Sequence, residues 1–272
     1  QRTANPCTPV RFRARPPEIR HASSWRQCRS DRVFRAHPRH ISRAWANMTV
    51  DFTQRRIKMV DGQLRTTDVN DARVLDAFLA VPREEFVPRA KRELAYIDED
   101  IEVSPAGRDA GMPRFLMEPS PFGRLVQLAE VRPTDFVLDI GCATGYSAAV
   151  LSRLASSVVA LESDPELAQQ ATETLSRLGF DNVAVVEGPL NQGCPAEAPY
   201  DVILLGGAVD EIPETLFAQL RDGGRLVAVT GEGLAGVAQV FLKSGEIVSG
   251  RRVFNAAVRR LPGFERSPEF VF

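Results

Sequence analysis

Residues 137–151 read VLDIGCATGYSAAVL, and this stretch decides the fold. The apolar run at its start predicts a buried strand, and the small and apolar residues after Tyr146 predict a helix. The turn between them carries Gly141 and Gly145, which let a ligand approach the backbone closely. A strand, a glycine-bearing turn and a helix in this order are typical of a site for a nucleotide-like cofactor.

Strand-like and helix-like segments alternate from Asp135 to about residue 230. Continuous apolar strands separated by amphipathic helices are typical of a parallel sheet that helices cover on both faces. The stretch at 237–254 differs, because two strand-like runs meet at a short turn that we place at Ser244–Gly245. The predicted fold class is therefore α/β, a Rossmann-like doubly wound, mostly parallel sheet with an antiparallel C-terminal hairpin and an N-terminal helical segment.

The N-terminal helical segment covers about residues 48–87, where apolar residues recur at helical spacing and Pro82 ends the second helix. Residues 97–118 show no clear period and contain two Pro and two Gly. We expect them to form a long connecting loop, of the kind that often carries function. The segment from Pro119 to Val131 then predicts another helix.

The first 47 residues differ in composition from the rest of the chain. They contain eleven Arg, no Lys and two acidic residues, a net charge of +9, so residues 48–272 carry −10 within a total of −1. All three His and both Trp also lie in this segment. We therefore expect a disordered Arg-rich tail at 1–47 and a single domain at 48–272, made of a helical cap and substrate loop at 48–118 and a cofactor-binding core at 119–272.

Three interpretations of the tail stay open. Its Arg residues would neutralise the phosphates of a nucleic acid, or would serve an organelle transit peptide. The interpretation that we favour is that the tail is not native protein, because the chain begins with Gln1 and Met48 opens a segment of different character. A reading frame extended upstream of its true start would have this appearance.

The four Cys are scattered, without a CxxC pair or a Cys/His cluster at metal-ligand spacing. We expect reduced thiols in a cytoplasmic protein, and no structural metal. The apolar runs do not approach the roughly 20 residues that cross a bilayer, so we expect no membrane partner. We also expect a monomer, with no nucleic-acid partner for the domain.

The turn at 141–146 fits neither of two common phosphate-binding patterns. A dinucleotide-binding GxGxxG that starts at Gly141 would need glycine where Ala143 and Tyr146 stand. The Gly-Lys-Ser/Thr of a nucleoside-triphosphate loop is missing as well. The ligand of this turn is therefore expected to lack a pyrophosphate.

Two carboxylates accompany the turn instead. Asp139 lies at the end of the first strand, and Glu162 lies at the end of the next strand, 21 residues after Gly141. A carboxylate at the second place can accept hydrogen bonds from both hydroxyls of a ribose, and one at the first can orient a cationic group. This combination resembles the S-adenosyl-L-methionine (SAM) site of Rossmann-like methyltransferases.

The predicted cofactor-binding residues are Asp139, Gly141, Cys142, Gly145, Tyr146, Glu162 and Gly188. We interpret Cys142 as a small filler rather than a nucleophile, because residues 48–272 contain no His to activate it.

The resemblance extends from Met48 to the C-terminus. VLDAFLAVPREEFVP, LAYIDEDIEV, LGFDNVAVVEG and PYDVILLGGAVDEIPETLFAQLRDGGRLVAVTG resemble, in order, segments of protein-L-isoaspartate O-methyltransferases. The resemblance implies methyl transfer from SAM to the misplaced carboxylate of isoaspartyl residues in damaged proteins. The implied partner is a protein or peptide that bears this carboxylate acceptor. Because the carboxylate is itself the nucleophile, catalysis needs alignment more than acid–base groups.

Two places depart from the pattern of that family. Its substrate loop carries a Ser whose hydroxyl contacts the substrate carboxylate, but Met117 stands at this position and Glu118 follows it. Met offers no donor and Glu118 would repel an anion. Arg114 is a nearby candidate to replace the donor, and the alternative is that it is a solvated arginine of the loop. After the third strand, Gly188 is followed by Pro189, where the family often has an Asp near the adenine amino group.

Three hypotheses follow for the function. The favoured one is an isoaspartyl methyltransferase with a rebuilt substrate loop, in which Arg114, Met117 and Glu118 are the candidates for contact with the acceptor. The second is a methyltransferase of the same lineage with a different acceptor. The third is a SAM-binding protein without repair activity, because Met117 replaces the expected Ser.

Overall fold

The structure is a computed structural model that describes residues 50–104, 112–231 and 236–265. The chain divides into two units, Gln1–Met48 and Thr49–Phe272, and everything described belongs to the second unit. The predictions about the Arg-rich tail therefore lie outside the described residues.

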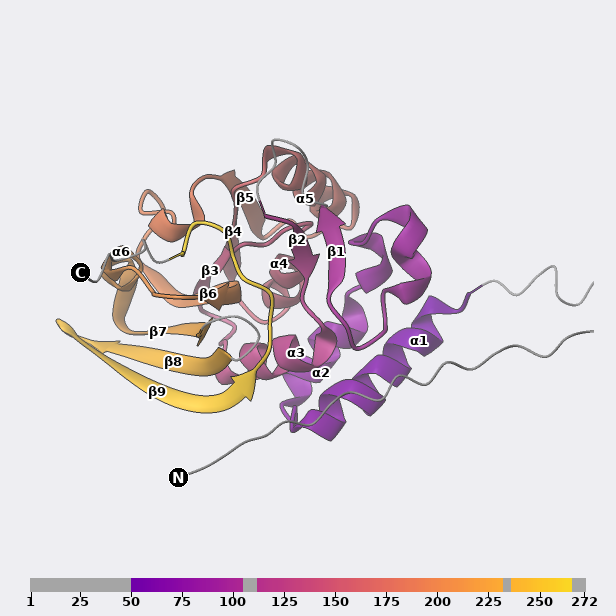
Figure 1. Ribbon diagram of the computed structural model, residues 1–272, viewed down its shortest axis with the longest axis horizontal. Coiled ribbons are helices and arrows are strands. Elements are labelled where there is room, and N and C mark those ends of the chain that lie inside the picture. Colours follow the sequence, from indigo (N-terminus) through magenta and orange to yellow (C-terminus); the bar gives the residue numbers. More distant parts are fainter. Residues whose placement is uncertain (1–49, 105–111, 232–235, 266–272) are drawn as a thin grey trace, which may run out of the picture. The chain divides into compact units, whose positions relative to one another are not determined.

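A seven-stranded sheet forms the centre of this unit, with the strand order β5-β4-β3-β6-β7-β8-β9 (Figure 1). The strands are β3 (Phe136–Ile140), β4 (Ser157–Glu162), β5 (Val183–Glu187), β6 (Tyr200–Val209), β7 (Leu220–Thr230), β8 (Gly236–Ser244) and β9 (Ile247–Ala256). The strands from β3 to β7 are parallel, and β8 and β9 pair antiparallel. The strand order reverses at β3, so ligands are expected at its carboxyl end. The predicted α/β class is confirmed.

Helices and helical turns pack on both faces of the sheet. The helices are α1 (Phe52–Met59), α2 (Ala72–Ala80), α3 (Pro119–Leu128), α4 (Tyr146–Ser152), α5 (Pro165–Arg177) and α6 (Glu214–Ala218), with shorter turns at Val60–Leu64, Arg65–Thr67, Arg83–Glu85, Arg89–Leu94 and Leu190–Gln192. Alternate residues of a strand point to opposite faces. Val137 accordingly packs in the core with α1 to α5, and Leu138 packs in the second core with α6.

The helix ends follow the local signals in the sequence. Asp164 caps α5 by accepting hydrogen bonds from the amides of Glu166 and Leu167, at 2.9 and 3.2 Å. Pro165 is the first residue of this helix, and Gly179 follows its end with φ of +74°. These are the favoured residues at these places, so the prediction of this helix is confirmed.

The expectation of a loop without regular structure at 97–118 is wrong in part. Two short strands, β1 (Ile101–Ser104) and β2 (Arg114–Leu116), pair antiparallel within this segment. Strands of four and three residues are too short to show an alternating pattern in the sequence. Phe115 and Leu116 of β2 line the same cavity as Tyr146 and Ser147 of α4, so β2 belongs to the surroundings of the cofactor turn.

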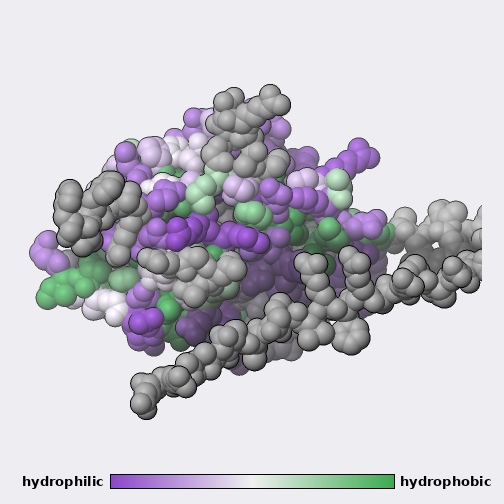
Figure 2. Space-filling view, in the orientation of Figure 1, coloured by the Kyte–Doolittle hydropathy of each residue, from purple (hydrophilic) through white to green (hydrophobic). Residues whose placement is uncertain are grey.

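The C-terminal hairpin is confirmed, with its turn one residue later than expected. Ser244 still pairs with Ile247, so Gly245 and Glu246 form the turn. Ile247 is 72% exposed, and Figure 2 shows apolar surface at the end of the unit where this hairpin turns. No helix of the described ranges is long and apolar enough to cross a membrane.

Arg225 on β7 holds the end of α3 against the sheet. Its guanidinium donates to the carbonyl oxygens of Ala129 and Glu130 and to Asp135 Oδ2, the last at 2.6 Å. The side chains of Arg225 and Asp135 are only 12% and 7% exposed. Removing one partner of such a buried pair leaves an uncompensated charge, which is strongly destabilising.

We expect Arg225→Ala to lower the free energy of unfolding by about 3–5 kcal/mol, measured by urea denaturation. The matched control is Arg221→Ala on the same strand, because Arg221 pairs with Asp201 at 2.7 Å but is 52% exposed. An exposed pair contributes about 0–1 kcal/mol. Equal losses in the two variants would contradict the role given to Arg225.

Candidate active site

The backbone bends sharply between β3 and α4. Gly141 and Gly145 have φ values of +83° and +93°, which favour glycine. A Cβ at Gly141 would lie 2.6 Å from Leu261 Cδ2, and one at Gly145 would lie 3.0 Å from Leu175 Cδ1. The conformation therefore favours glycine at both places, and the turn brings the backbone to the carboxyl end of the sheet.

Asp139 is a buried carboxylate beside this turn. Its Oδ2 accepts a hydrogen bond of 2.6 Å from the hydroxyl of Ser147, and its Oδ1 has no partner among the described residues. Burial raises the pKa of Asp139 to about 7, while the hydrogen bond from Ser147 opposes the rise; of the nearby charges, Glu162 adds to it and Arg114 counters it. A buried carboxylate oxygen without a donor fits a cationic ligand group.

Glu162 is fully buried at the end of β4, the strand next to β3. Its Oε1 accepts from the amides of Ser163 and Asp164 at 2.8 and 3.1 Å, and from the Ser163 hydroxyl at 3.3 Å. Its Oε2 accepts from the amide of Ala143 at 2.7 Å and from Arg114 Nη2 at 2.8 Å. Glu162 therefore joins the two turns that follow β3 and β4 to strand β2.

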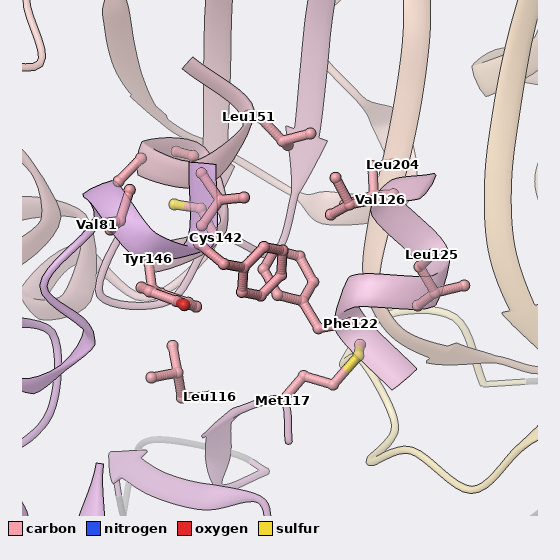
Figure 3. Close-up of a cluster of buried hydrophobic side chains, with 14 of the residues drawn as sticks. Val81, Leu116, Met117, Phe122, Leu125, Val126, Cys142, Tyr146, Leu151 and Leu204 are labelled. Atoms are coloured by element: carbon pink, nitrogen blue, oxygen red, sulfur yellow. The ribbon is translucent and has the colours of Figure 1, made fainter. Parts of the chain in front are cut away.

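A small cavity lies between the turn and β2. Its volume is about 20 Å³, which is room for about one water molecule. The residues that line it are Phe115, Leu116, Met117, Phe122, Gly141, Cys142, Ala143, Tyr146, Ser147 and Gly206. Figure 3 shows Leu116 and Met117 facing Tyr146 and Phe122 across this apolar region. This cavity by itself is therefore far smaller than SAM.

Some of the predicted cofactor-binding residues lie close to one another in the structure. Gly141, Cys142 and Tyr146 line the cavity, and Asp139 lies at the end of β3, just before the turn. Gly188 lies on the far side of Glu162, because its amide donates to the Glu162 carbonyl oxygen at 3.0 Å. In the described ranges, no group of three or more His, Cys, Asp or Glu is arranged to hold a metal ion.

Cys142 and Tyr146 both have packing roles. The Cys142 side chain is buried, and burial raises the pKa of its thiol well above the usual range, so the thiol stays neutral. The ring of Tyr146 contacts those of Phe78, Phe86 and Phe122, with centroids 5.7–6.3 Å apart. These contacts fit the interpretation of Cys142 as a filler, and they make Tyr146 part of the core beneath the cavity.

Met117 and Glu118 differ in their surroundings. Met117 is buried in the cavity wall, and its carbonyl oxygen accepts a hydrogen bond of 2.8 Å from Arg83. Glu118 precedes α3 and does not line the cavity, and its amide donates to Asp100 at 3.0 Å. Burial and then the nearby charges, foremost that of Asp100, raise the pKa of Glu118 to about 7. Of the candidate acceptor contacts, Arg114 and Met117 therefore lie nearest to the turn.

Three residues of the site are missing from the sequence prediction. Ser147 binds Asp139, and its place in the first turn of a helix was a signal that could have identified it. Thr144 donates to the carbonyl oxygen of Phe86 at 2.6 Å, which ties the cofactor turn to the N-terminal segment. Arg83 is fully buried, and no local pattern marks an arginine for burial.

Comparisons with known proteins give one family. The sequence model of the family described as Protein-L-isoaspartate(D-aspartate) O-methyltransferase matches residues 54–258. A protein-L-isoaspartate O-methyltransferase of Koribacter versatilis is 39% identical over 180 residues, which are 66% of this chain and 78% of that protein. A relative of the same name from a Roseiflexus species is 34% identical over 225 residues, 81% of this chain and 100% of its own.

Solved structures agree with this assignment. A structure of a protein-L-isoaspartate O-methyltransferase is 31% identical with a TM-score of 0.67, and the match covers 76% of this chain and 66% of that one. A putative enzyme of the same name from Plasmodium falciparum, in complex with S-adenosyl-L-homocysteine, shares the fold with a TM-score of 0.61 at 20% identity, over 75% of this chain and 96% of that one. These findings agree with the resemblance in the sequence: the fold is the same, the family model matches most of the domain, and the identities exceed 30%. The chain therefore belongs to the protein-L-isoaspartate (D-aspartate) O-methyltransferase family of SAM-dependent methyltransferases.

Proposed function

We propose that this protein transfers the methyl group of SAM to the free carboxylate of isoaspartyl residues in damaged proteins. The observation that carries the proposal is the pair of buried carboxylates, Asp139 and Glu162, at the carboxyl ends of neighbouring strands. This edge of the sheet is where doubly wound folds bind their ligands. The identity of the acceptor, an isoaspartyl carboxylate, is inferred from the family to which the chain belongs.

The charges and the backbone around the turn suit SAM. The open Oδ1 of Asp139 suits the ammonium group of the methionine end, and the bare backbone at Gly141 leaves room for close approach. Glu162 has the position for the ribose hydroxyls, once one of its present donors leaves. When bound, SAM supplies a methyl group on a sulfonium, which is a good leaving group.

The chain has little acid–base work to do in this reaction. A carboxylate acceptor is already ionised near neutral pH and attacks the methyl carbon itself. The described domain contributes alignment of the reacting atoms and exclusion of water, which together supply much of the rate in such reactions. Leu116, Met117 and Phe122 form the apolar wall that excludes water.

The alternative hypotheses about the acceptor rest on the substrate loop. Met117 cannot donate a hydrogen bond to a carboxylate, which motivates the alternatives of a different acceptor or of binding without repair. The family model and the relatives carry the isoaspartyl name, and nothing in them favours either alternative.

We further propose that the enzyme acts as a monomer in the cytoplasm on protein or peptide substrates. Cys142 and Cys194 are both buried free thiols, which a reducing compartment maintains.

The proposed acceptor is tested directly with a peptide pair that differs only in an isoaspartyl or a normal aspartyl linkage. We expect methyl transfer from labelled SAM to the isoaspartyl peptide, and background incorporation into the aspartyl peptide. Asp139→Asn should lower the transfer because it removes the charge opposite the ammonium group. Demonstrated SAM binding without transfer to the isoaspartyl peptide would exclude this function.

The raised pKa of Asp139 predicts how cofactor binding depends on pH. A cationic ammonium group binds the ionised carboxylate, and protonation of Asp139 below its pKa of about 7 removes that form. The dissociation constant of S-adenosyl-L-homocysteine should therefore rise by about tenfold per pH unit as the pH falls below about 7, and should level off at higher pH. Calorimetry at several pH values measures this profile.

Asp139→Asn is the control for this profile, because the amide does not titrate. Its binding should be weaker at neutral pH and nearly independent of pH. A flat profile for the unsubstituted protein would show that Asp139 does not face the ammonium group.

A further inference from the structure

Arg114 lies where the predicted cofactor site needs room. Its Nη2 is 2.8 Å from Glu162 Oε2 and 3.2 Å from the position that a Cβ on Gly141 would take. The side chains of Arg114 and Glu162 are 6% and 0% exposed. The guanidinium thus lies between the residue expected to bind the ribose and the glycine expected beneath the adenosyl group.

Glu162 has no capacity left for a ligand while Arg114 is bound to it. Its Oε1 accepts from three groups of Ser163 and Asp164. The Ala143 amide and Arg114 take the two lone pairs of its Oε2, so departure of Arg114 frees one position on Oε2. Three of the donors are backbone amides, held by the turns that follow β3 and β4. Arg114 has the one long side chain in this set, so it can leave while the backbone stays in place.

Little else in the described structure holds the guanidinium of Arg114. Its Nη1 has no hydrogen-bond partner there, although it is buried. Among the described strands, β2 pairs only with β1, in a two-stranded sheet with an irregular register. Such a pair of strands is marginally stable by itself. Desolvation offsets much of the attraction in a buried ion pair, and a second carboxylate can replace Glu162 as the partner without leaving the guanidinium uncompensated.

The segment that follows Arg114 forms the cavity wall. Phe115, Leu116 and Met117 all line the cavity, whose volume of about 20 Å³ is far smaller than SAM. The cavity wall and the guanidinium of Arg114 therefore belong to one short segment. Because Met117 has no donor, an acceptor carboxylate that reaches the site needs another cationic or hydrogen-bonding partner.

Two other arginines near this wall already have partners. Arg83 is fully buried and donates to the carbonyl oxygens of Ala95 and Met117. Arg259 lies over the ring of Phe115 and pairs with Asp100 at 3.3 Å. Arg114 differs from both, because its present partner is the carboxylate that the ribose is expected to take.

We propose that Arg114 binds the carboxylate of the acceptor during methyl transfer, and that it leaves Glu162 when the ribose hydroxyls of the cofactor bind there. This inference rests on the proposed function, since it needs an anionic acceptor. A guanidinium and a carboxylate form a strong, geometrically defined pair. The acceptor oxygen forms a bond to the methyl carbon as the carbon–sulfur bond breaks, giving a neutral ester and a neutral thioether, and no proton is transferred.

Arg114→Gln tests the inference, because it removes the charge and keeps a polar side chain. We expect S-adenosyl-L-homocysteine to bind about tenfold more tightly by calorimetry, since its ribose no longer competes with Arg114. The KM for the isoaspartyl peptide should rise about 10- to 100-fold, as for loss of a charge-assisted hydrogen bond, with a smaller change in kcat. The unsubstituted protein should bind the peptide more tightly in the presence of S-adenosyl-L-homocysteine than without it.

Arg114→Lys and Arg177→Gln are the matched variants. Lysine keeps the charge but not the forked geometry, so its KM should lie between those of the unsubstituted protein and Arg114→Gln. Should Arg114→Gln fail to fold, the Lys variant carries the test through its raised KM. Arg177 is 53% exposed and pairs with Glu85 away from the cavity, so Arg177→Gln should change neither constant.

The outcomes separate this inference from the proposed function. Weaker cofactor binding in Arg114→Gln, or an unchanged KM with an active unsubstituted enzyme, would overturn the role of Arg114 and leave the proposed function intact. An unsubstituted enzyme that binds SAM but does not methylate the isoaspartyl peptide would overturn the proposed function.

Discussion

Burial of two carboxylates at one edge of a parallel sheet constrains the rest of this site. A buried charge is costly unless donors meet it, and the two carboxylates are met in different ways. Glu162 receives three backbone amides, which fixes the turns after β3 and β4, and it receives Arg114, which draws β2 over the cavity. Asp139 accepts a hydrogen bond from one hydroxyl, that of Ser147. This does not fully offset the desolvation of its charge, so the pKa of Asp139 is raised.

Much of the fold could be predicted because its signals are local. A few neighbouring residues are enough to predict the apolar strand at Val137, the helix cap at Asp164 and the glycine turns. The pairing of β1 with β2 could not be predicted, because neither strand is long enough to show a period. The turn of the C-terminal hairpin was misplaced by one residue, since two glycine-containing registers fit the same alternation.

The site, like the fold, contains features that the sequence predicts and features that it does not. Asp139 and Glu162 could be placed together from the sequence, because they end neighbouring parallel strands of a doubly wound sheet. The contact of Arg114 with Glu162 spans 48 residues and depends on how a short hairpin packs over the sheet. No periodic pattern in the sequence predicts such packing. From the sequence alone, Arg114 was a candidate only because it lies close to Met117, which replaces the expected Ser. Arg83 was missed for a related reason, since its burial depends on carbonyl oxygens of two other segments.

The departures in the substrate loop acquire a physical meaning in this arrangement. Met117 adds apolar surface to the cavity, while Arg114 brings a cation to the cofactor edge of the same segment. A hydroxyl that contacts an acceptor needs no counter-ion, but a buried guanidinium does. Glu162 supplies that counter-ion and is also the residue suited to the ribose. Cofactor binding and the position of Arg114 are therefore coupled through one carboxylate.

A crystal structure with S-adenosyl-L-homocysteine bound is the most direct measurement of this coupling. We predict that the ribose hydroxyls bind Glu162, that the ammonium group lies at Asp139 Oδ1, and that Arg114 has left Glu162 and points toward the acceptor side of the cavity. A structure in which Arg114 still pairs with Glu162 while the cofactor is bound would contradict this account.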